Sequence, residues 1–116
     1  MESLPRSDSR ILRAGAIEIN VDRCIVWVQG ASVDLTTKEC KLLVTLVEAK
    51  GEVVSRNFLL EKVWGSSSPS DIESRTVSVH IHRLRQKLGP EGRHIITVKN
   101  VGYRYDISFE WIKFGT

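Results

Sequence analysis

The sequence predicts an α+β domain in which a small N-terminal antiparallel sheet precedes three helices and a C-terminal β-hairpin. Three observations support this order: short β-forming runs at the start, helical apolar periodicity in the middle, and two β-forming runs around a glycine-containing turn near the end. With 116 residues, 41% of them hydrophobic and 27% charged, the chain has the size and composition of one globular domain.

The start of the chain, residues 1–13, is polar, contains Pro5 and shows no periodicity, so we assign it to a linker or tail. Strand signals follow at residues 16–20, 24–28 and 32–35, and turn-forming residues separate them. We place the folded domain at residues 14–108. Residues 109–116 form a C-terminal tail with no predicted partner for its aromatic side chains.

Three helices are predicted over residues 37–49, 56–64 and 72–88. Thr36 is the N-cap of the first, and Glu39, three residues later, completes a capping box. Ser55 caps the second helix. Glycines are placed to end all three, at Gly51, Gly65 and Gly89. The last strand signals, residues 94–98 and 103–107, flank a four-residue turn and predict a hairpin.

The third helix has two chemically different faces. Its apolar residues recur at helical spacing and predict a narrow stripe that packs on the other helices: Val77, Ile81, Leu84 and Leu88. The opposite face carries Arg75, Val79, His82, Arg83 and Gln86, with His80 and Arg85 on the two flanks. A basic face opposite a core face is what a helix needs to enter the major groove of DNA.

The basic charge of the chain is concentrated in this region. Residues 1–70 hold nine Lys and Arg against nine Asp and Glu, whereas residues 71–104 hold seven against three, a net charge of +4. Clustered Lys and Arg suit phosphate binding, because neutralised phosphates release counterions. A solvated basic face is the alternative explanation of the same pattern.

Val79 lies on the polar face, where burial does not explain it. An apolar side chain among arginines can contact a thymine methyl group, and an arginine can bind guanine O6 and N7 with two hydrogen bonds. Isolated exposed valines are also common without any function, so this position favours DNA only slightly.

No catalytic or metal site is predicted. His80 and His82 are two residues apart on a helix and point in nearly opposite directions, so they do not share a metal. Cys24 and Cys40 have no CxxC spacing and are expected to be buried thiols. Without a nucleophile–base set, paired carboxylates or a phosphate-binding glycine loop, we expect neither enzymatic activity nor a cofactor.

The hairpin is a second candidate for nucleic-acid contact. Thr97, Lys99, Tyr103 and Arg104 surround its turn, and such a protruding wing can lie along a minor groove or the DNA backbone. Alternatively, Ile95, Tyr103, Tyr105 and Ile107 pack as an ordinary closing hairpin while the charges face water. Both hold together if the strand faces alternate. The predicted fold is therefore a winged helix-turn-helix.

The residue pattern closely resembles the OmpR/PhoB family of response-regulator effector domains. The matching segments are Glu73–Leu88 (ESRTVSVHIHRLRQKL), residues 97–104 (TVKNVGYR), residues 35–43 (LTTKECKLL), and the positions around Val54-Ser55-Arg56, Leu59-Leu60 and Val63-Trp64-Gly65. They occur in the family's order and span about residues 16–107.

The resemblance implies sequence-specific binding to double-stranded DNA and regulation of transcription in a two-component system. The implied DNA contacts are Arg75, Val79, His80, His82, Arg83 and Arg85 from the helix, with Thr97, Lys99 and Tyr103 from the wing. The loop after the second helix would contact RNA polymerase, through Trp64, Ser66, Ser67, Ser68, Ser70 and Asp71. The family also implies a head-to-tail dimer on tandem repeats, an upstream receiver domain and a sensor histidine kinase.

Three positions depart from the family pattern. His82 stands where arginine is frequent, so part of the electrostatic attraction depends on pH. Lys99 replaces a usual arginine and lacks its planar fork, which favours a phosphate contact over base recognition. Asn100 replaces a usual glycine, but asparagine tolerates the left-handed conformation, so the turn is expected to survive.

Two alternative functions are weighed against this one: first, a winged helix whose basic face binds an acidic protein without DNA specificity, and second, a metal-dependent enzyme. The chain has neither an apolar run long enough to span a membrane nor a signal-peptide-like start. We therefore expect a cytoplasmic bacterial protein without membrane contact.

Overall fold

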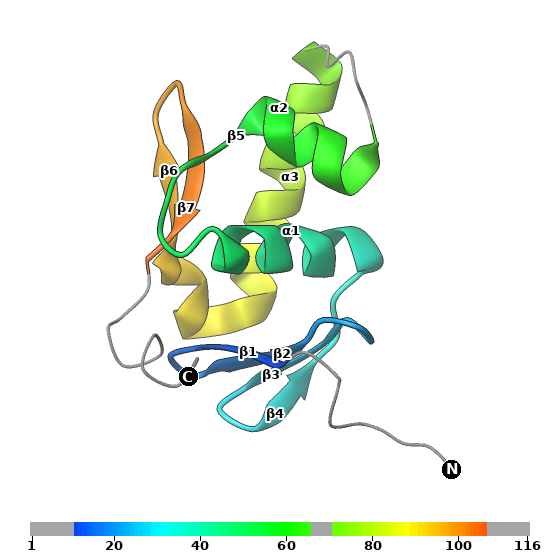
Figure 1. Cartoon of the computed structure of the whole chain (residues 1–116), viewed down its shortest axis with the longest axis vertical. Coiled ribbons are helices and arrows are strands. Elements are labelled where there is room, and N and C mark those ends of the chain that lie inside the picture. Colours follow the sequence, from blue (N-terminus) through cyan, green and yellow to red (C-terminus); the bar gives the residue numbers. More distant parts are fainter. Residues whose placement is uncertain (1–10, 66–70, 107–116) are drawn as a thin grey trace.

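The computed structural model describes residues 11–65 and 71–106, except for the side chains of residues 71–74. A small antiparallel sheet lies at one end of the molecule, the helices pack above it, and the C-terminal hairpin stands beside them (Figure 1). The predicted α+β class, with its N-terminal sheet, helices and C-terminal hairpin, is confirmed.

The N-terminal sheet contains β1 (Ile11–Ala14), β2 (Ile17–Asn20), β3 (Ile25–Val28) and β4 (Ala31–Val33), paired antiparallel in chain order. Ile17, Ile19 and Val26 point into the core and are completely buried. The last three strands lie within two residues of their predicted bounds.

The strand β1 was not predicted, and residues 11–13, which we assigned to the N-terminal tail, belong to the sheet. Ile11 pairs with Asn20 and Ala14 pairs with Ile17. Leu12 and Ala14 face the core, but the apolar Ile11 is exposed and interrupts the apolar–polar alternation of the sequence. Backbone pairing with β2, together with the core contacts of Leu12 and Ala14, holds this strand in place.

The helix α1 (Thr37–Glu48) begins with the predicted capping box. The Glu39 amide donates to Thr36 Oγ1 at 3.2 Å, and the Thr36 amide donates to Glu39 Oε1 at 2.9 Å. The inward side chains of α1 are completely buried: Cys40, Leu42, Leu43, Leu46 and Val47. The helix ends before Gly51, because Ala49 is already its C-cap and Lys50 takes a left-handed conformation.

The second helical segment, predicted over residues 56–64, consists of α2 (Arg56–Leu59) and the π-helical turn η1 (Leu60–Trp64). Ser55 caps it as predicted, since its hydroxyl accepts from the Phe58 amide at 3.0 Å. Gly65, with a φ of 73°, ends it. The serine-rich stretch, residues 66–70, lies outside the described residues.

The longest helix is α3 (Asp71–Leu88), followed by the 3-10 helix η2 (Gly89–His94), which was not predicted. The predicted apolar stripe of α3 is confirmed, because all four of its members are at most 1% exposed: Val77, Ile81, Leu84 and Leu88. A partly buried ion pair joins this helix to α1, where Lys87 Nζ lies 2.8 Å from Glu39 Oε1. The Glu39 side chain is 2% exposed, against 38% for Lys87.

The C-terminal hairpin consists of β6 (Ile95–Val98) and β7 (Gly102–Tyr105). A third strand, β5 (Val54–Ser55), pairs with β7 and was not predicted, because two residues are too few for a periodic pattern. A Cβ at Gly102 would overlap the Val54 carbonyl oxygen, so glycine is needed for this approach. Ile107, expected in the last strand, lies outside the described residues.

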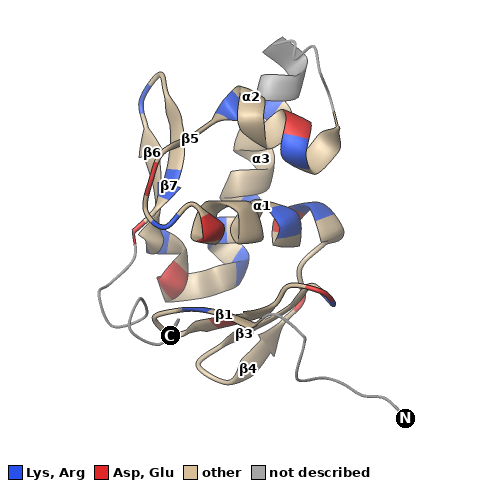
Figure 2. Ribbon diagram, viewed as in Figure 1, with Lys and Arg blue, Asp and Glu red and all other residues tan. Residues whose placement is uncertain are grey.

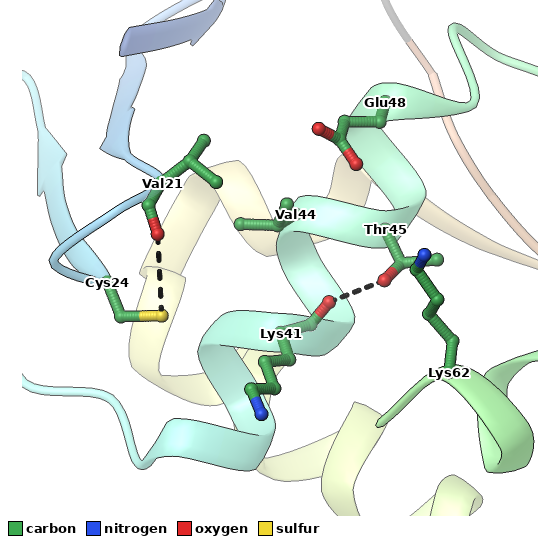
Figure 3. Close-up of a pocket in the computed structure, with 7 residues that line it drawn as sticks. All are labelled: Val21, Cys24, Lys41, Val44, Thr45, Glu48 and Lys62. Atoms are coloured by element: carbon green, nitrogen blue, oxygen red, sulfur yellow. Dashed lines mark hydrogen bonds between the residues drawn. The ribbon is translucent and has the colours of Figure 1, made fainter. Parts of the chain in front are cut away.

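A pocket of about 280 Å³ separates the turn after β2 from the outer side of α1 (Figure 3). It is lined by Val21, Cys24, Lys41, Val44, Thr45, Glu48 and Lys62. Both cysteines are free thiols, and the expectation of burial is confirmed for Cys40, whereas Cys24 is only partly buried. Burial and the neighbouring Cys24 raise the pKa of the Cys40 thiol to about 12.

Within residues 11–65 and 71–106, no helix has the length and apolarity that a membrane crossing requires.

Candidate nucleic-acid interface

The outer face of α3 is open, as predicted from its periodicity. Arg75, His82, Arg83 and Gln86 are exposed, and Val79 is 45% exposed. The buried stripe on the other side holds the helix against the core. The side chains of this face are therefore presented on a rigid element, with no other part of the described chain covering them.

The described part of this surface carries cations but no anions. Residues 75–88 contain no carboxylate, so no acidic side chain of the described part of α3 competes for Arg75 or Arg83. Figure 2 shows basic residues on α3 and at the tip of the neighbouring hairpin. A carboxylate-free row of cations suits a polyanionic partner.

Arg85 differs from the expected DNA contact, because its guanidinium is used inside the protein. Its Nε and Nη2 donate to the Ile95 carbonyl oxygen at 3.0 and 2.8 Å. Nη2 also donates to Thr97 Oγ1 at 2.8 Å. Thr97, another expected contact, is thus bound to the helix through the same guanidinium.

Tyr103 also differs from the expected wing contact. Only 3% of the residue is exposed, and its hydroxyl lies 3.2 Å from Ser78 Oγ on α3. With Ile95 and Tyr105 also buried, the inner side of the hairpin packs as an ordinary closing hairpin. Its exposed residues are concentrated at the tip.

The tip of the hairpin is a tight turn. Asn100 has a φ of 66°, which confirms that asparagine takes the left-handed conformation there. The Val101 amide closes the turn by donating to the Val98 carbonyl at 2.9 Å. Lys99 and Val101 are exposed, the latter by 52%. Arg104, lower on β7, lies 3.8 Å from Asp106.

His80 is fixed by its surroundings. Its Nδ1 lies 2.8 Å from the Thr76 carbonyl oxygen, and because a carbonyl only accepts, Nδ1 is the donor. The Nε2 atom is then an acceptor when the ring is neutral. The imidazole stands edge-on to Trp64, with ring centroids 5.0 Å apart and an interplanar angle of 83°.

Lys38 was not predicted from the sequence, although it contacts the same Trp64 ring as His80. Its Nζ lies 5.8 Å from the Trp64 ring centroid and donates to the Val63 carbonyl at 3.2 Å. It adds a cation from α1 to the Trp64 ring that His80 of α3 also contacts. No local pattern signals it, because the contact depends on how the two helices cross.

The structure brings together only part of two predicted groups, the histidines of α3 and the polymerase-contact loop. His82 is exposed and does not share the His80 cluster, and the described residues contain no group of three or more candidate metal ligands. Of the expected polymerase-contact loop, Trp64 is described, and Asp71 opens α3 without a described side chain. The others, Ser66, Ser67, Ser68 and Ser70, lie outside the described residues.

Comparisons with known proteins agree with this geometry. The family described as "Transcriptional regulatory protein, C terminal" matches residues 30–105. The sensory transduction protein RegX3 of Mycolicibacterium smegmatis is 34% identical over 103 residues, which cover 86% of this chain and 44% of that protein. The chain thus spans less than half the length of this relative.

Solved structures show the same fold. The DNA-binding domain of CpxR from E. coli is 32% identical with a TM-score of 0.73, and the match covers 84% of this chain and 96% of that one. The Klebsiella pneumoniae RstA DNA-binding domain, solved in complex with the RstA box, is 30% identical with a TM-score of 0.72, over 83% of this chain and 96% of that one. The chain therefore belongs to the family of C-terminal domains of transcriptional regulatory proteins, the OmpR/PhoB type of effector domain.

Proposed function

We propose that this domain binds double-stranded DNA in a sequence-specific manner and thereby regulates transcription. The observation that carries the proposal is the exposed basic face of α3, which has no carboxylate between residues 75 and 88 and is held from behind by a buried stripe. The major groove is about 12 Å wide and admits one helix. The RstA domain, which shares the fold, was solved with its DNA box.

Within this proposal the outer face of α3 reads base edges. Arg75 and Arg83 are placed to bind guanine, and Val79 to contact a thymine methyl group. His82 adds a contact at the same face. His80, held against Trp64, presents its remaining ring nitrogen at the flank of the helix, where a phosphate or base edge is the expected partner.

The wing lies along the adjacent minor groove or backbone. Its exposed cation is Lys99, and the ammonium group suits a phosphate better than a base pair. The expected contacts from Arg85, Thr97 and Tyr103 are not retained as direct ones, because hydrogen bonds within the protein or burial already engage these side chains.

In the whole protein, we propose that a receiver domain controlled by a sensor histidine kinase precedes this domain. RegX3, more than twice as long as the matched region, is a sensory transduction protein. Two copies bound head to tail on tandem repeats, and contact with RNA polymerase through residues 64–71, complete the proposed assembly.

A salt titration tests the proposed function. Binding to a duplex selected from random sequences is expected to weaken by orders of magnitude as the salt concentration rises, because several phosphates are neutralised. Binding to single-stranded DNA of the same composition is expected to be much weaker. Equal, weak binding to every polyanion would instead support a domain that recognises acidic proteins.

Lys99→Ala is expected to weaken binding to all duplexes by the same factor. If Lys99 neutralises one phosphate, the slope of log K against log salt concentration falls by about 0.9 in magnitude. Fluorescence anisotropy at several salt concentrations measures both quantities. A change in sequence preference, rather than in slope, would show that Lys99 reads a base.

A further inference from the structure

The residues that join α3 to the hairpin form two separate attachments. At one, Ser78 Oγ and the Tyr103 hydroxyl lie 3.2 Å apart. At the other, Arg85 binds the Ile95 carbonyl and Thr97 Oγ1. We call these contacts the helix–wing brace.

The two attachments fix both distance and angle. Ser78 and Arg85 are seven residues apart, which is about 10 Å along the axis of an α-helix. One attachment would set only how far the hairpin stands from α3. Two attachments, one to β7 and one to β6, also prevent the hairpin from rotating relative to the helix.

The hairpin needs such support. Its strands have four residues each, and its only further strand partner in the described chain is the two-residue β5. Short strand pairs of this kind are marginally stable by themselves. The position of Lys99 at the tip therefore depends on the contacts that the two strands make with α3.

The bonds of Arg85 also exclude a two-pronged contact with DNA. Three of the five guanidinium N–H groups are engaged: the one on Nε and both on Nη2. A bidentate contact requires two neighbouring nitrogens with available protons. Only Nη1 has protons outside these three bonds, so Arg85 is suited to a positioning role.

We propose that Arg85 and Tyr103 are positioning residues that hold the wing at a fixed place beside the reading helix, so that bases and flanking backbone are recognised as one unit. This inference rests on the proposed DNA binding. It predicts that the wing and the helix are energetically coupled on DNA, and that the coupling is lost with the brace.

Two conservative variants test the brace: Arg85→Lys, which keeps the charge but lacks the fork, and Tyr103→Phe, which removes only the hydroxyl. Each is expected to weaken binding to the selected duplex by about 3- to 10-fold, the equivalent of one or two neutral hydrogen bonds. The salt slope is expected to fall by part of the roughly 0.9 assigned to Lys99, because the displaced wing weakens that phosphate contact. Arg93→Lys, at an exposed position of η2, is the matched control and is expected to bind as wild type.

A double-mutant cycle supplies the decisive readout. In the Arg85→Lys and Tyr103→Phe backgrounds, Lys99→Ala is expected to cost less than half of its wild-type effect, since the wing is already displaced. Additive losses would overturn the proposal. A second result would also overturn it: Arg85→Lys binds with full affinity while Arg85→Ala shows a reduced salt slope. That combination would mean that the charge of Arg85 contacts a phosphate directly.

Hydrogen exchange without DNA separates failure of the brace from failure of the proposed function. Amides of β6 and β7 are expected to exchange faster in both conservative variants, while those of α3 keep their protection. Unchanged hairpin protection would overturn the brace even if the protein binds duplex DNA. Weakened protection in a protein that binds no duplex would instead refute the proposed function and, with it, the role assigned to Arg85 and Tyr103.

Discussion

Replacing Lys87 by methionine is expected to lower the free energy of unfolding at neutral pH by about 2 to 3 kcal/mol. The substitution keeps the apolar stem of the side chain but removes the ammonium group 2.8 Å from Glu39 Oε1. The Glu39 side chain is only 2% exposed. Without Lys87 its buried negative charge keeps the hydrogen bond from the Thr36 amide at the N-cap but has lost its cation. Urea denaturation at pH 7 measures the loss.

The loss is expected to shrink in acid. Burial opposes ionisation of Glu39, but the hydrogen bond from Lys87 and the Thr36 amide outweigh it and hold the pKa below its ordinary value. The ionised carboxylate therefore stabilises wild type fully above the unfolded-state pKa of about 4.3, and this contribution disappears as the pH falls through the lower folded-state pKa. Without Lys87, burial prevails and the carboxyl group takes up a proton at higher pH.

Lys99→Met is the control for this experiment, because the same substitution at the exposed tip of the hairpin leaves Glu39 untouched. Its free energy of unfolding is expected to match wild type within about 0.5 kcal/mol. If Lys87→Met showed the same deficit at pH 3 as at pH 7, the ion pair would not be its cause.

The elements that were predictable from the sequence are those whose signals are local. The capping box at Thr36 and Glu39 lies within four residues, and the apolar stripe of α3 repeats within one helix. Both depend only on the spacing of residues along the chain, so a single sequence is enough to predict their positions. The open basic face followed from the same periodicity, because it is what the stripe leaves outside.

The features that sequence reasoning missed depend on contacts between distant segments. β5 exists because Val54 meets Tyr103, and Lys38 reaches Trp64 from another helix. A helical projection places Arg85 on a flank of α3 but does not show that the Ile95 carbonyl lies opposite it. Basic residues at a predicted interface therefore divide into reading and bracing residues only once the packing is known.

Arg83→Ala is expected to weaken binding to the selected duplex by about 1 to 3 kcal/mol, roughly 5- to 150-fold. Arg83 is exposed on the outer face of α3, and no carboxylate of residues 75–88 competes for it. Unlike the guanidinium of Arg85, which is bonded to the hairpin, that of Arg83 keeps its planar fork available for guanine O6 and N7. Binding measured on the selected duplex and on its single-base variants gives the cost at each position.

If Arg83 recognises a base, its removal abolishes the sequence preference at one base pair. This result distinguishes a base contact from a phosphate contact. In Arg83→Ala, duplexes that differ at that base pair are expected to bind equally, while discrimination at the other positions is retained. Arg23→Ala, which removes the same charge from the exposed turn after β2, is expected to leave both affinity and preference unchanged. A uniform loss on all duplexes, with a shallower salt slope, would move Arg83 from the bases to the backbone. The specificity of the domain would then have to come from Arg75, Val79, the histidines or the shape of the DNA.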